Sequence, residues 1–284
     1  MERNRRLATW TGAILGAFLA LLVSSALAHA RDDGDEVVEE FHQTYPLDPK
    51  GRIELENVNG AVDITAWDEN QVKVDAIKRA PDKRRLDDAE IRVVAHNDSI
   101  LIRTRYHEQN GWGSDRSPAS VEYALSVPRN ARLDEIKVIN GALDISGAAG
   151  EVRASSINGR LTVEGLAGEA RLSTINSRLK ADFSRLGPEP IDLASVNGGV
   201  ELTLPSDAKA TIEANTIHGE IDNDFGLHTN NHRWVGHDLR GQLGGGGTEI
   251  TLHNVNGGID IRHASDGRAL SPAKDTGEHR RGSV

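Results

Sequence analysis

Short segments in which apolar and polar residues alternate make up most of the chain. Apolar residues recur at every second position in "RIELE", "AVDITAW" and "VEYALSV". A period of two residues is typical of β-strands with one buried and one solvent-exposed face. Turn-forming residues such as Asn-Gly and Asn-Asp separate these segments. The pattern predicts an all-β protein, with antiparallel pairing of strands over residues 36–130.

From residue 133 the alternation becomes a repeat with a Val/Ile-Asn-Gly corner in each unit. The asparagines at positions 140, 158, 176 and 197 are separated by 18, 18 and 21 residues. In the next corner, 21 residues later, His218 replaces the asparagine, and the last corner, at Asn256, follows 38 residues after that. Ser177 replaces the glycine of one corner. An earlier corner with the same motif lies at Asn59-Gly60. The predicted structural corner residues are therefore Asn59, Gly60, Asn140, Gly141, Asn158, Gly159, Asn176, Asn197, Gly198, His218, Gly219, Asn256 and Gly257.

Two architectures fit this repeat. In an antiparallel β-meander or sandwich each corner is a hairpin turn, which pairs Arg153 with Glu164 and Lys137 with Asp144. In a β-solenoid each unit of 18–21 residues is one coil, and successive coils lie ~4.8 Å apart in parallel ladders. Near-constant spacing favours the solenoid, because stacking needs the same corner at every coil. Glycine supplies the positive φ of a tight corner, and asparagine tolerates that region and forms amide ladders. Both architectures bury Leu143, Ile145, Val152, Ala154, Leu161 and Val163.

The first thirty residues have the three-part plan of a secretory signal peptide. Arginines at positions 3, 5 and 6 precede an apolar run over 11–28, and Ala28-His29-Ala30 provides a small-x-small cleavage site. We expect export to the periplasm or cell surface, with cleavage after Ala30. The competing interpretation is an uncleaved anchor, since about 20 apolar residues span a bilayer. In that case this segment is the protein's contact with the membrane.

The net charge argues against nucleic-acid partners, and the absence of cysteine excludes stabilisation by disulfide bonds. The chain carries a formal net charge of −10, which disfavours nucleic-acid partners because their binding depends on phosphate neutralisation. It contains no cysteine, so no disulfide stabilises the fold and burial and backbone pairing must do so.

The order of several motifs resembles a known family. "VNGAVDITAWDENQVKVDAIKRA" is followed by "VEYALSVPRNARL", by the serial corners and finally by "LGGGGTEITLHNVNGGIDI". Over residues 37–262 this order resembles the bacterial putative-adhesin family, an exported domain of unknown function. The resemblance implies a β-solenoid-like fold and a cell-envelope setting, and it brings no catalytic residues.

The candidate chemistry is weak throughout. His228, His232 and His237 lack the spacing of a metal motif, and "GGGG" at 244–247 lacks the Lys-Ser/Thr of a phosphate loop. Acidic residues follow several corners, but they are expected on the solvated side of each strand. We therefore predict no catalytic residues, no metal and no cofactor. The candidate contact loops are residues 107–120 and 224–247, which contain Trp112 and Trp234.

The sequence thus predicts a non-enzymatic exported envelope protein that binds or scaffolds an envelope protein or polysaccharide. The alternatives are a β-helix enzyme or binding module acting on polysaccharide, and a regulatory partner of an envelope-stress system. The predicted parts are a signal peptide at 1–30, a β-rich N-terminal portion of the adhesin-like domain at 31–132, β-solenoid repeats at 133–263 with an insertion at 224–247, and a disordered tail at 264–284.

Overall fold

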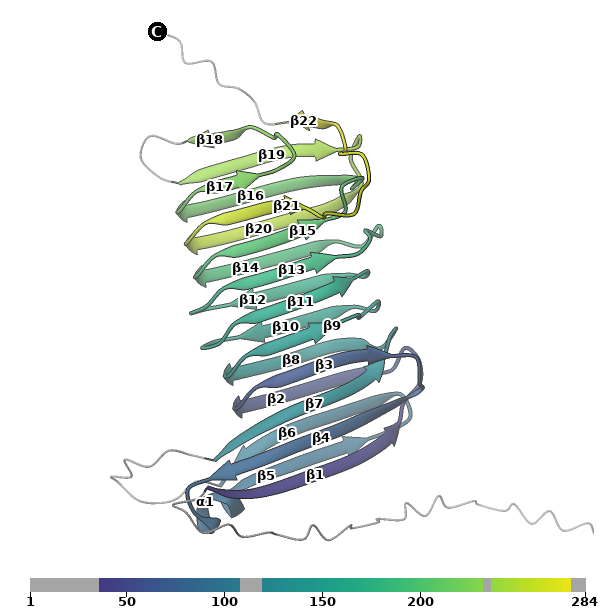
Figure 1. Ribbon diagram of the computed structural model, residues 1–284, viewed down its shortest axis with the longest axis vertical. Coiled ribbons are helices and arrows are strands. Elements are labelled where there is room, and N and C mark those ends of the chain that lie inside the picture. Colours follow the sequence, from purple (N-terminus) through teal and green to yellow (C-terminus); the bar gives the residue numbers. More distant parts are fainter. Residues whose placement is uncertain (1–35, 108–118, 232–235, 277–284) are drawn as a thin grey trace, which may run out of the picture.

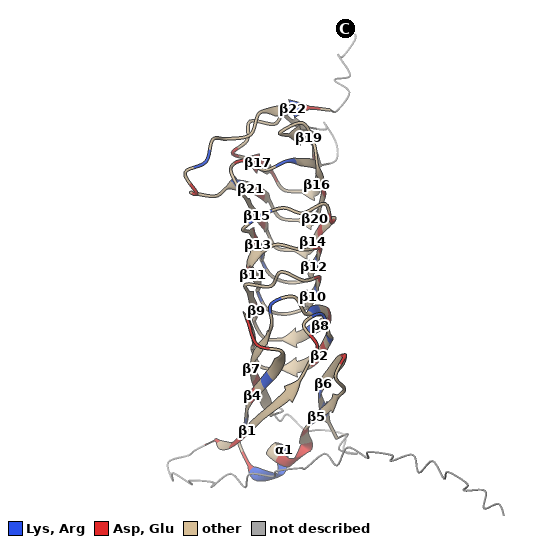
Figure 2. Cartoon of the chain, turned by 90° about the vertical axis from the view of Figure 1, so that its right-hand side faces the viewer, with Lys and Arg blue, Asp and Glu red and all other residues tan. Residues whose placement is uncertain are grey.

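The computed structural model describes residues 36–107, 119–231 and 236–276. In this part the chain is all-β apart from one short helix, and it forms an elongated stack of strands (Figure 1). Two large mixed sheets run along the stack and face each other (Figure 2). No helix among the described residues is long and apolar enough to cross a membrane. The predicted signal peptide lies outside the described residues.

Each sheet is a continuous row of strands. Sheet A has the order β1 (Val37–Pro46), β4 (Gln71–Ala80), β7 (Ser120–Pro128), β3 (Val62–Trp67), β9 (Leu143–Ser146), β11 (Leu161–Leu166), β13 (Leu179–Phe183), β15 (Val200–Leu204), β21 (Ile259–His263), β17 (Ile221–Asn223). Sheet B has the order β18 (Thr229–Asn231), β19 (His237–Leu243), β16 (Ala210–His218), β20 (Thr248–Asn256), β14 (Ile191–Asn197), β12 (Ala170–Thr174), β10 (Val152–Ser156), β8 (Arg132–Asn140), β2 (Arg52–Asn59), β6 (Ser99–Tyr106), β5 (Ala89–Ala95), and β22 (Ala273–Asp275) pairs with β19.

Every Asn-Gly corner carries the chain from sheet B to sheet A. The two strands that flank a corner form one layer of the stack, and each layer pairs in parallel with the next. Leu161 of β11 lies opposite Leu143 of β9, and Arg153 of β10 lies opposite Arg171 of β12. The hairpin alternative is therefore wrong for these corners, because the strands before and after each corner belong to different sheets.

The layers do not stack in sequence order. Layer β20–β21, which contains the last corner, lies between β14–β15 and β16–β17. Its strand β20 pairs in parallel with β14 on one side and with β16 on the other. The chain thus passes over one position in the stack, turns back antiparallel through β19 and fills that position last (Figure 1).

The N-terminal portion shares both sheets with the repeats. The expected antiparallel pairing is found for β1 with β4, β4 with β7 and β5 with β6. It is wrong for β2 and β3, which pair in parallel with their neighbours on both sides. The reason is the corner at Asn59, which places β2 and β3 in opposite sheets as a layer of the same stack.

The core is a thin column of aliphatic side chains between the sheets. The residues that the alternation predicted to be buried, Leu143, Ile145, Val152, Ala154, Leu161 and Val163, are at most 5% exposed. They belong to one continuous cluster that reaches from the N-terminal strands to β21. Alternation is therefore sufficient to find the inward side chains of β9, β10 and β11 at these positions.

Different elements cover the two ends of the stack. Helix α1 (Lys83–Asp88) lies at the N-terminal end and buries Leu86 there (Figure 2). At the other end β19 lies antiparallel on β16, and β18 and β22 pair with β19. The tail at 264–284 was expected to be disordered, but part of it is ordered. Its strand β22 pairs with β19, and Ser271 is buried just before that strand.

Candidate functional site

The corner edge of the stack carries a column of hydrogen-bonded asparagines. Each amide nitrogen Nδ2 donates to the Oδ1 of the asparagine in the adjacent layer, at distances between 2.8 and 3.0 Å. We call this column the amide ladder; it consists of Asn59, Asn140, Asn158, Asn176, Asn197 and Asn256. His218 takes the next position in the backbone register.

The glycines of the corners are required for two different reasons. Positive φ, as predicted, occurs at Gly60, Gly198 and Gly257. Gly141, Gly159 and Gly219 do not have positive φ; a Cβ there would lie 2.1, 1.9 and 2.0 Å from a carbonyl oxygen of the neighbouring layer. The corner asparagines do not use the positive-φ region that asparagine tolerates, since no non-glycine residue among those described has positive φ.

Buried polar side chains support the corners from inside. The hydroxyl of Ser156 donates to the carbonyl of Gly159 at 2.8 Å, and that of Ser195 donates to Gly198 at 3.2 Å. Asn57 and Thr216 bond corner carbonyls in the same way. Each lies two residues before the ladder position, as in "SIN" and "TIH". Sequence reasoning missed these residues, although their spacing from the corner is constant.

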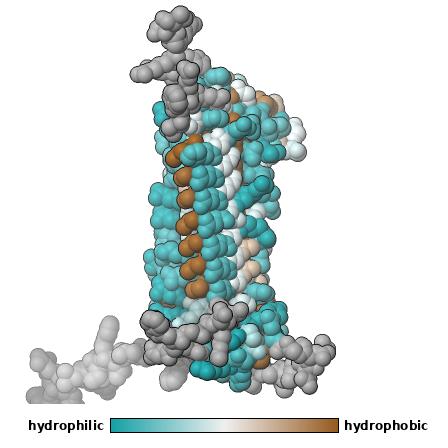
Figure 3. Space-filling view, turned by 90° about the vertical axis from the view of Figure 1, so that its left-hand side faces the viewer, coloured by the Kyte–Doolittle hydropathy of each residue, from teal (hydrophilic) through white to brown (hydrophobic). Residues whose placement is uncertain are grey.

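An exposed row of aliphatic residues lies directly beside the amide ladder. Each member precedes the ladder residue of its layer, and the row forms the brown column that runs along the stack in Figure 3. We call it the aliphatic stripe; its exposed members, in stack order, are Ile139, Ile157, Ile175, Val196, Val255 and Ile217, with exposed fractions of 37–45%. Val58 continues the row below Ile139 and is less exposed.

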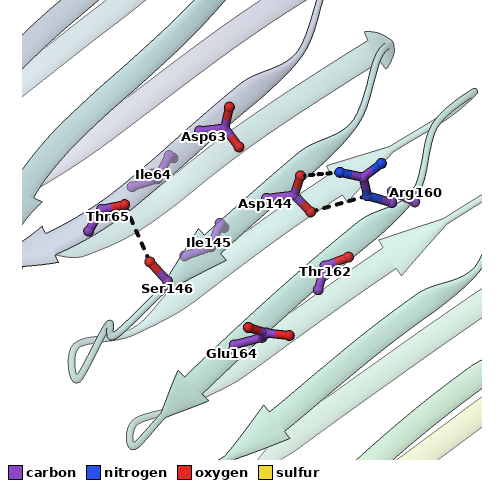
Figure 4. A pocket seen from close by; sticks show the side chains of 9 residues that line it. All are labelled: Asp63, Ile64, Thr65, Asp144, Ile145, Ser146, Arg160, Thr162 and Glu164. Atoms are coloured by element: carbon purple, nitrogen blue, oxygen red, sulfur yellow. Dashed lines mark hydrogen bonds and ion pairs between the residues drawn. The ribbon is translucent and has the colours of Figure 1, made fainter.

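A shallow pocket of about 320 Å³ lies on the outer face of sheet A (Figure 4). Asp63 and Asp144 stand side by side in the parallel register of β3 and β9. Arg160 binds both oxygens of Asp144, at 2.7 and 3.4 Å. Burial raises the pKa of the Asp63 carboxyl, and the nearby negative charge of Asp144 raises it further. This arrangement holds one neutralised carboxylate beside one carboxyl that binds a proton more readily than usual.

The acidic positions that follow the corners do not form one row along the whole of sheet A, although three of them are neighbours near its C-terminal end. Thr162 and Lys180 separate Asp144 from Glu201, as the sequence indicated. Because β21 lies between β15 and β17, Asp260 is placed between Glu201 and Asp222. Arginine side chains lie at 3.9 Å from Glu201 and 3.7 Å from Asp260. No group of three or more His, Asp or Glu residues in the described part is suited to hold a metal ion.

The tryptophans of the candidate contact loops, Trp112 and Trp234, lie outside the described residues, as does His232. Much of the second loop is ordinary sheet, because residues 237–243 form β19. His237 begins that strand, and the backbone N–H of His228 donates to the side chain of Asp275, the last residue of β22. The structure therefore does not bring the loop histidines together as a cluster within the part it describes.

The chain matches no family model and no curated protein. It is similar to a solved structure of a putative cell adhesion protein from Clostridium sporogenes, with 12% identity and a TM-score of 0.44 over 80% of this chain and 100% of that one. It is also similar to a putative adhesin from Bacteroides fragilis, with 9% identity and a TM-score of 0.37 over 80% of this chain and 97% of that one. A putative adhesin from Parabacteroides merdae gives 10% identity and a TM-score of 0.25 over 84% and 100%. These descriptions agree with the family that the corner motifs resemble.

Proposed function

We propose that this chain is a non-enzymatic, exported cell-envelope protein whose stack of layers is a β-solenoid, and that it binds or scaffolds another envelope component. The observation that carries the proposal is the parallel pairing of successive layers, with one corner motif repeated at one edge. Such a stack presents the same side chains at a fixed pitch of about 4.8 Å over its whole length. A regular surface of this kind suits the binding of an extended partner, by many equivalent contacts.

The chemistry of the described surface supports a binding role. Three carboxylates on sheet A, those of Asp144, Glu201 and Asp260, form ion pairs with Arg160, Arg178 and Arg262 respectively. A catalytic acid–base pair needs groups held at the reacting bond with matched pKa values. The corner edge offers amides and aliphatic side chains instead, which bind without reacting.

Export is tested by fractionating cells that produce the full chain and a variant lacking residues 1–30. We expect the full chain in the envelope or periplasmic fraction and the variant in the cytoplasm. Equal distribution of the two products would contradict the role of the N-terminal segment.

Binding is tested by incubating the purified chain with isolated envelopes and measuring co-sedimentation. A variant with Trp112→Ala and Trp234→Ala tests the candidate contact loops. Deleting residues 224–247 is a poor test, because it removes β19 and uncovers the end of the stack. Undiminished binding by the double variant would exclude the tryptophans as contacts.

A polysaccharide-acting enzyme is the second candidate, and the pocket at Asp63 and Asp144 is the observation that favours it. Glycoside hydrolysis uses two carboxyl groups, one of which has a raised pKa. Substituting Asp63→Asn and Asp144→Asn should abolish release of reducing sugar from envelope polysaccharide if this candidate is right. Absence of any release by the unaltered chain would exclude it for the substrates tried.

A further inference from the structure

The aliphatic stripe is unusual because no polar or charged residue interrupts it. Every layer from β8–β9 to β16–β17 contributes an isoleucine or valine that is 37–45% exposed. These positions face solvent, because the residue before each of them points into the core or the corner. Soluble proteins commonly interrupt exposed apolar rows with charged residues, since such rows promote association. Here no layer does so.

Stacking alone does not require this composition. Another outward column, on sheet A, runs through Asp144, Thr162, Lys180 and Glu201, and its layers pair in the same parallel register. Parallel pairing of the layers is therefore compatible with polar and charged outward residues. Stacking of the layers therefore does not account for the aliphatic composition of the stripe.

The surface on both sides of the stripe carries almost no charge. The amide ladder lies on one side. On the other side the outward column of sheet B consists of Lys137, Ser155, Ser173, Ala194, His253 and Asn215. These columns contain no carboxylate, although acidic residues exceed basic ones by ten over the chain. Two copies of this acidic molecule would repel each other least at this face.

We propose that the aliphatic stripe is a self-association surface, and that a second copy of this chain covers it. The stripe of one copy packs against the stripe of the other across a two-fold axis, which makes the interface isologous. A second copy has the same layer pitch, so its side chains match the row along its full length, as in dry interfaces between identical strands. This inference does not depend on the proposed envelope function.

The area of the face indicates a weak dimer. Six side chains with about two fifths of their surface exposed present roughly 400 Å² of apolar surface, within the ~300–600 Å² of the largest patch on a typical monomer. Specific interfaces bury about 800 Å² per partner. The stripe alone is smaller than this, and the interface must also include the amide ladder and the outward column of sheet B, so we expect reversible association.

The first experiment is sedimentation velocity on the full chain over a range of concentrations. We expect a reversible monomer–dimer equilibrium that the pair Ile157→Lys and Ile175→Lys weakens by at least about tenfold. The matched control, Thr162→Lys with Thr203→Lys, adds the same charge to the outer face of sheet A and should leave the equilibrium unchanged. Since every variant carries the same N-terminal segment, association through that segment would persist in all of them and would overturn the proposal.

A second pair of variants covers the case in which lysine in the stripe prevents folding. Ser155→Lys and Ser173→Lys add charge beside the stripe and leave its aliphatic contacts in place. They should weaken the dimer while the circular dichroism spectrum and the thermal midpoint stay unchanged. A dimer of unaltered strength would overturn the proposal.

Cysteine substitution locates the contact directly, because the chain has no cysteine of its own. Oxidation of Ile175→Cys should give a covalent dimer, and oxidation of the outward-facing Thr162→Cys should not. Ile139→Cys and Ile217→Cys report the relative direction of the copies: parallel copies cross-link at all three stripe positions, and antiparallel copies only near Ile175. A monomer at every concentration, or no cross-link at any stripe position, would overturn the proposal. Binding to lipid vesicles by the monomer in place of dimerisation would overturn it too.

Discussion

At the scale of single residues, backbone approach between layers decides which corner positions must be glycine. A Cβ at position 159 would lie 1.9 Å from the carbonyl oxygen of Gly141, which is far inside van der Waals contact. The corner at Ser177 shows that one layer accommodates a side chain at the equivalent place. Glycine is thus required at the corners because neighbouring layers approach closely there, and only in part because of the backbone torsion angles.

We predict that Gly159→Ala destabilises the fold by roughly 1–3 kcal/mol, because the neighbouring layer must shift to admit the methyl group. Denaturant unfolding monitored by circular dichroism measures the change. Ser177→Ala is the matched control and should change the free energy of unfolding by less than about 0.5 kcal/mol. Equal midpoints for the two variants would contradict the close-approach explanation.

A buried polar network fixes the first corner to the strands below it. The hydroxyl of Thr104 donates to Oδ1 of Asn57 at 2.9 Å and lies 2.8 Å from the Tyr123 hydroxyl. The Asn57 amide donates to the carbonyl of Val121 at 2.8 Å. The three side chains Asn57, Thr104 and Tyr123 are nearly inaccessible to solvent, so each polar atom depends on its partner.

Thr104→Val should cost roughly 1–3 kcal/mol of stability, because it leaves the Asn57 carbonyl and the Tyr123 hydroxyl buried without this partner. The shapes of the two side chains are similar, so packing is preserved. Thr65→Val, on the exposed face of β3, should have little effect on the thermal midpoint. Similar losses in both variants would show that the network adds no stability.

Tyr123 also predicts a dependence on alkaline pH. Burial raises its pKa from 10.0 to about 12. The unfolded chain therefore loses this proton near pH 10 while the folded chain retains it, so stability is complete below pH 10 and falls as the pH rises toward 12. The loss should reach about 3 kcal/mol. Denaturation curves between neutral pH and pH 12 measure it, and Tyr123→Phe should flatten the slope. An unchanged slope in that variant would assign the effect to other groups.

At the scale of elements, the last layer to be reached along the chain joins two earlier ones. Strand β20 is the shared parallel neighbour of β14 and β16. We predict that ending the chain after Gly247 exposes the amides of β16 and β17 to rapid hydrogen exchange, whereas β9 to β13 stay protected. Ending it after Asp266 removes β22 alone and should leave β16 protected. Unchanged protection of β16 in the shorter chain would contradict the shared-neighbour arrangement.

The strands and their buried faces could be predicted from the sequence, but the order of the layers could not. Alternation fixes which side chains of β9, β10 and β11 point inward, because that depends on neighbouring positions in one strand. The corners at Asn197, His218 and Asn256 carry nearly the same motif, so each can stack on any other. Which of them are neighbours depends on the path through β19, and local sequence patterns do not encode that path.

The aliphatic stripe was missed for a related reason. In "SSIN" the polar Ser156 points inward and the apolar Ile157 points outward, which inverts the usual rule for a half-buried strand. A signal was present, since Val or Ile precedes the ladder position at every corner. Only the parallel register shows that these residues, up to 116 positions apart between Ile139 and Val255, form one row.

At the scale of the whole molecule, net charge and the stripe act in opposite directions on association. The chain carries a charge of −10, so two copies repel at long range. We predict that dimerisation strengthens as salt rises from about 0.01 M to about 1 M, where the Debye length falls from about 30 Å to about 3 Å. Sedimentation at several salt concentrations measures this. An interface built on ion pairs would weaken instead.

The late filling of the position between β14 and β16 has a consequence for synthesis. As the chain emerges from N- to C-terminus, the lower layers can assemble while residues 248–261 are still being made. Until then β14 and β16 each have an open edge, and the hydrophobic column between the sheets is incomplete at that level. A prematurely terminated product keeps this gap and is open to proteases there. The final corner thus closes the stack only after the last of its layers has been made.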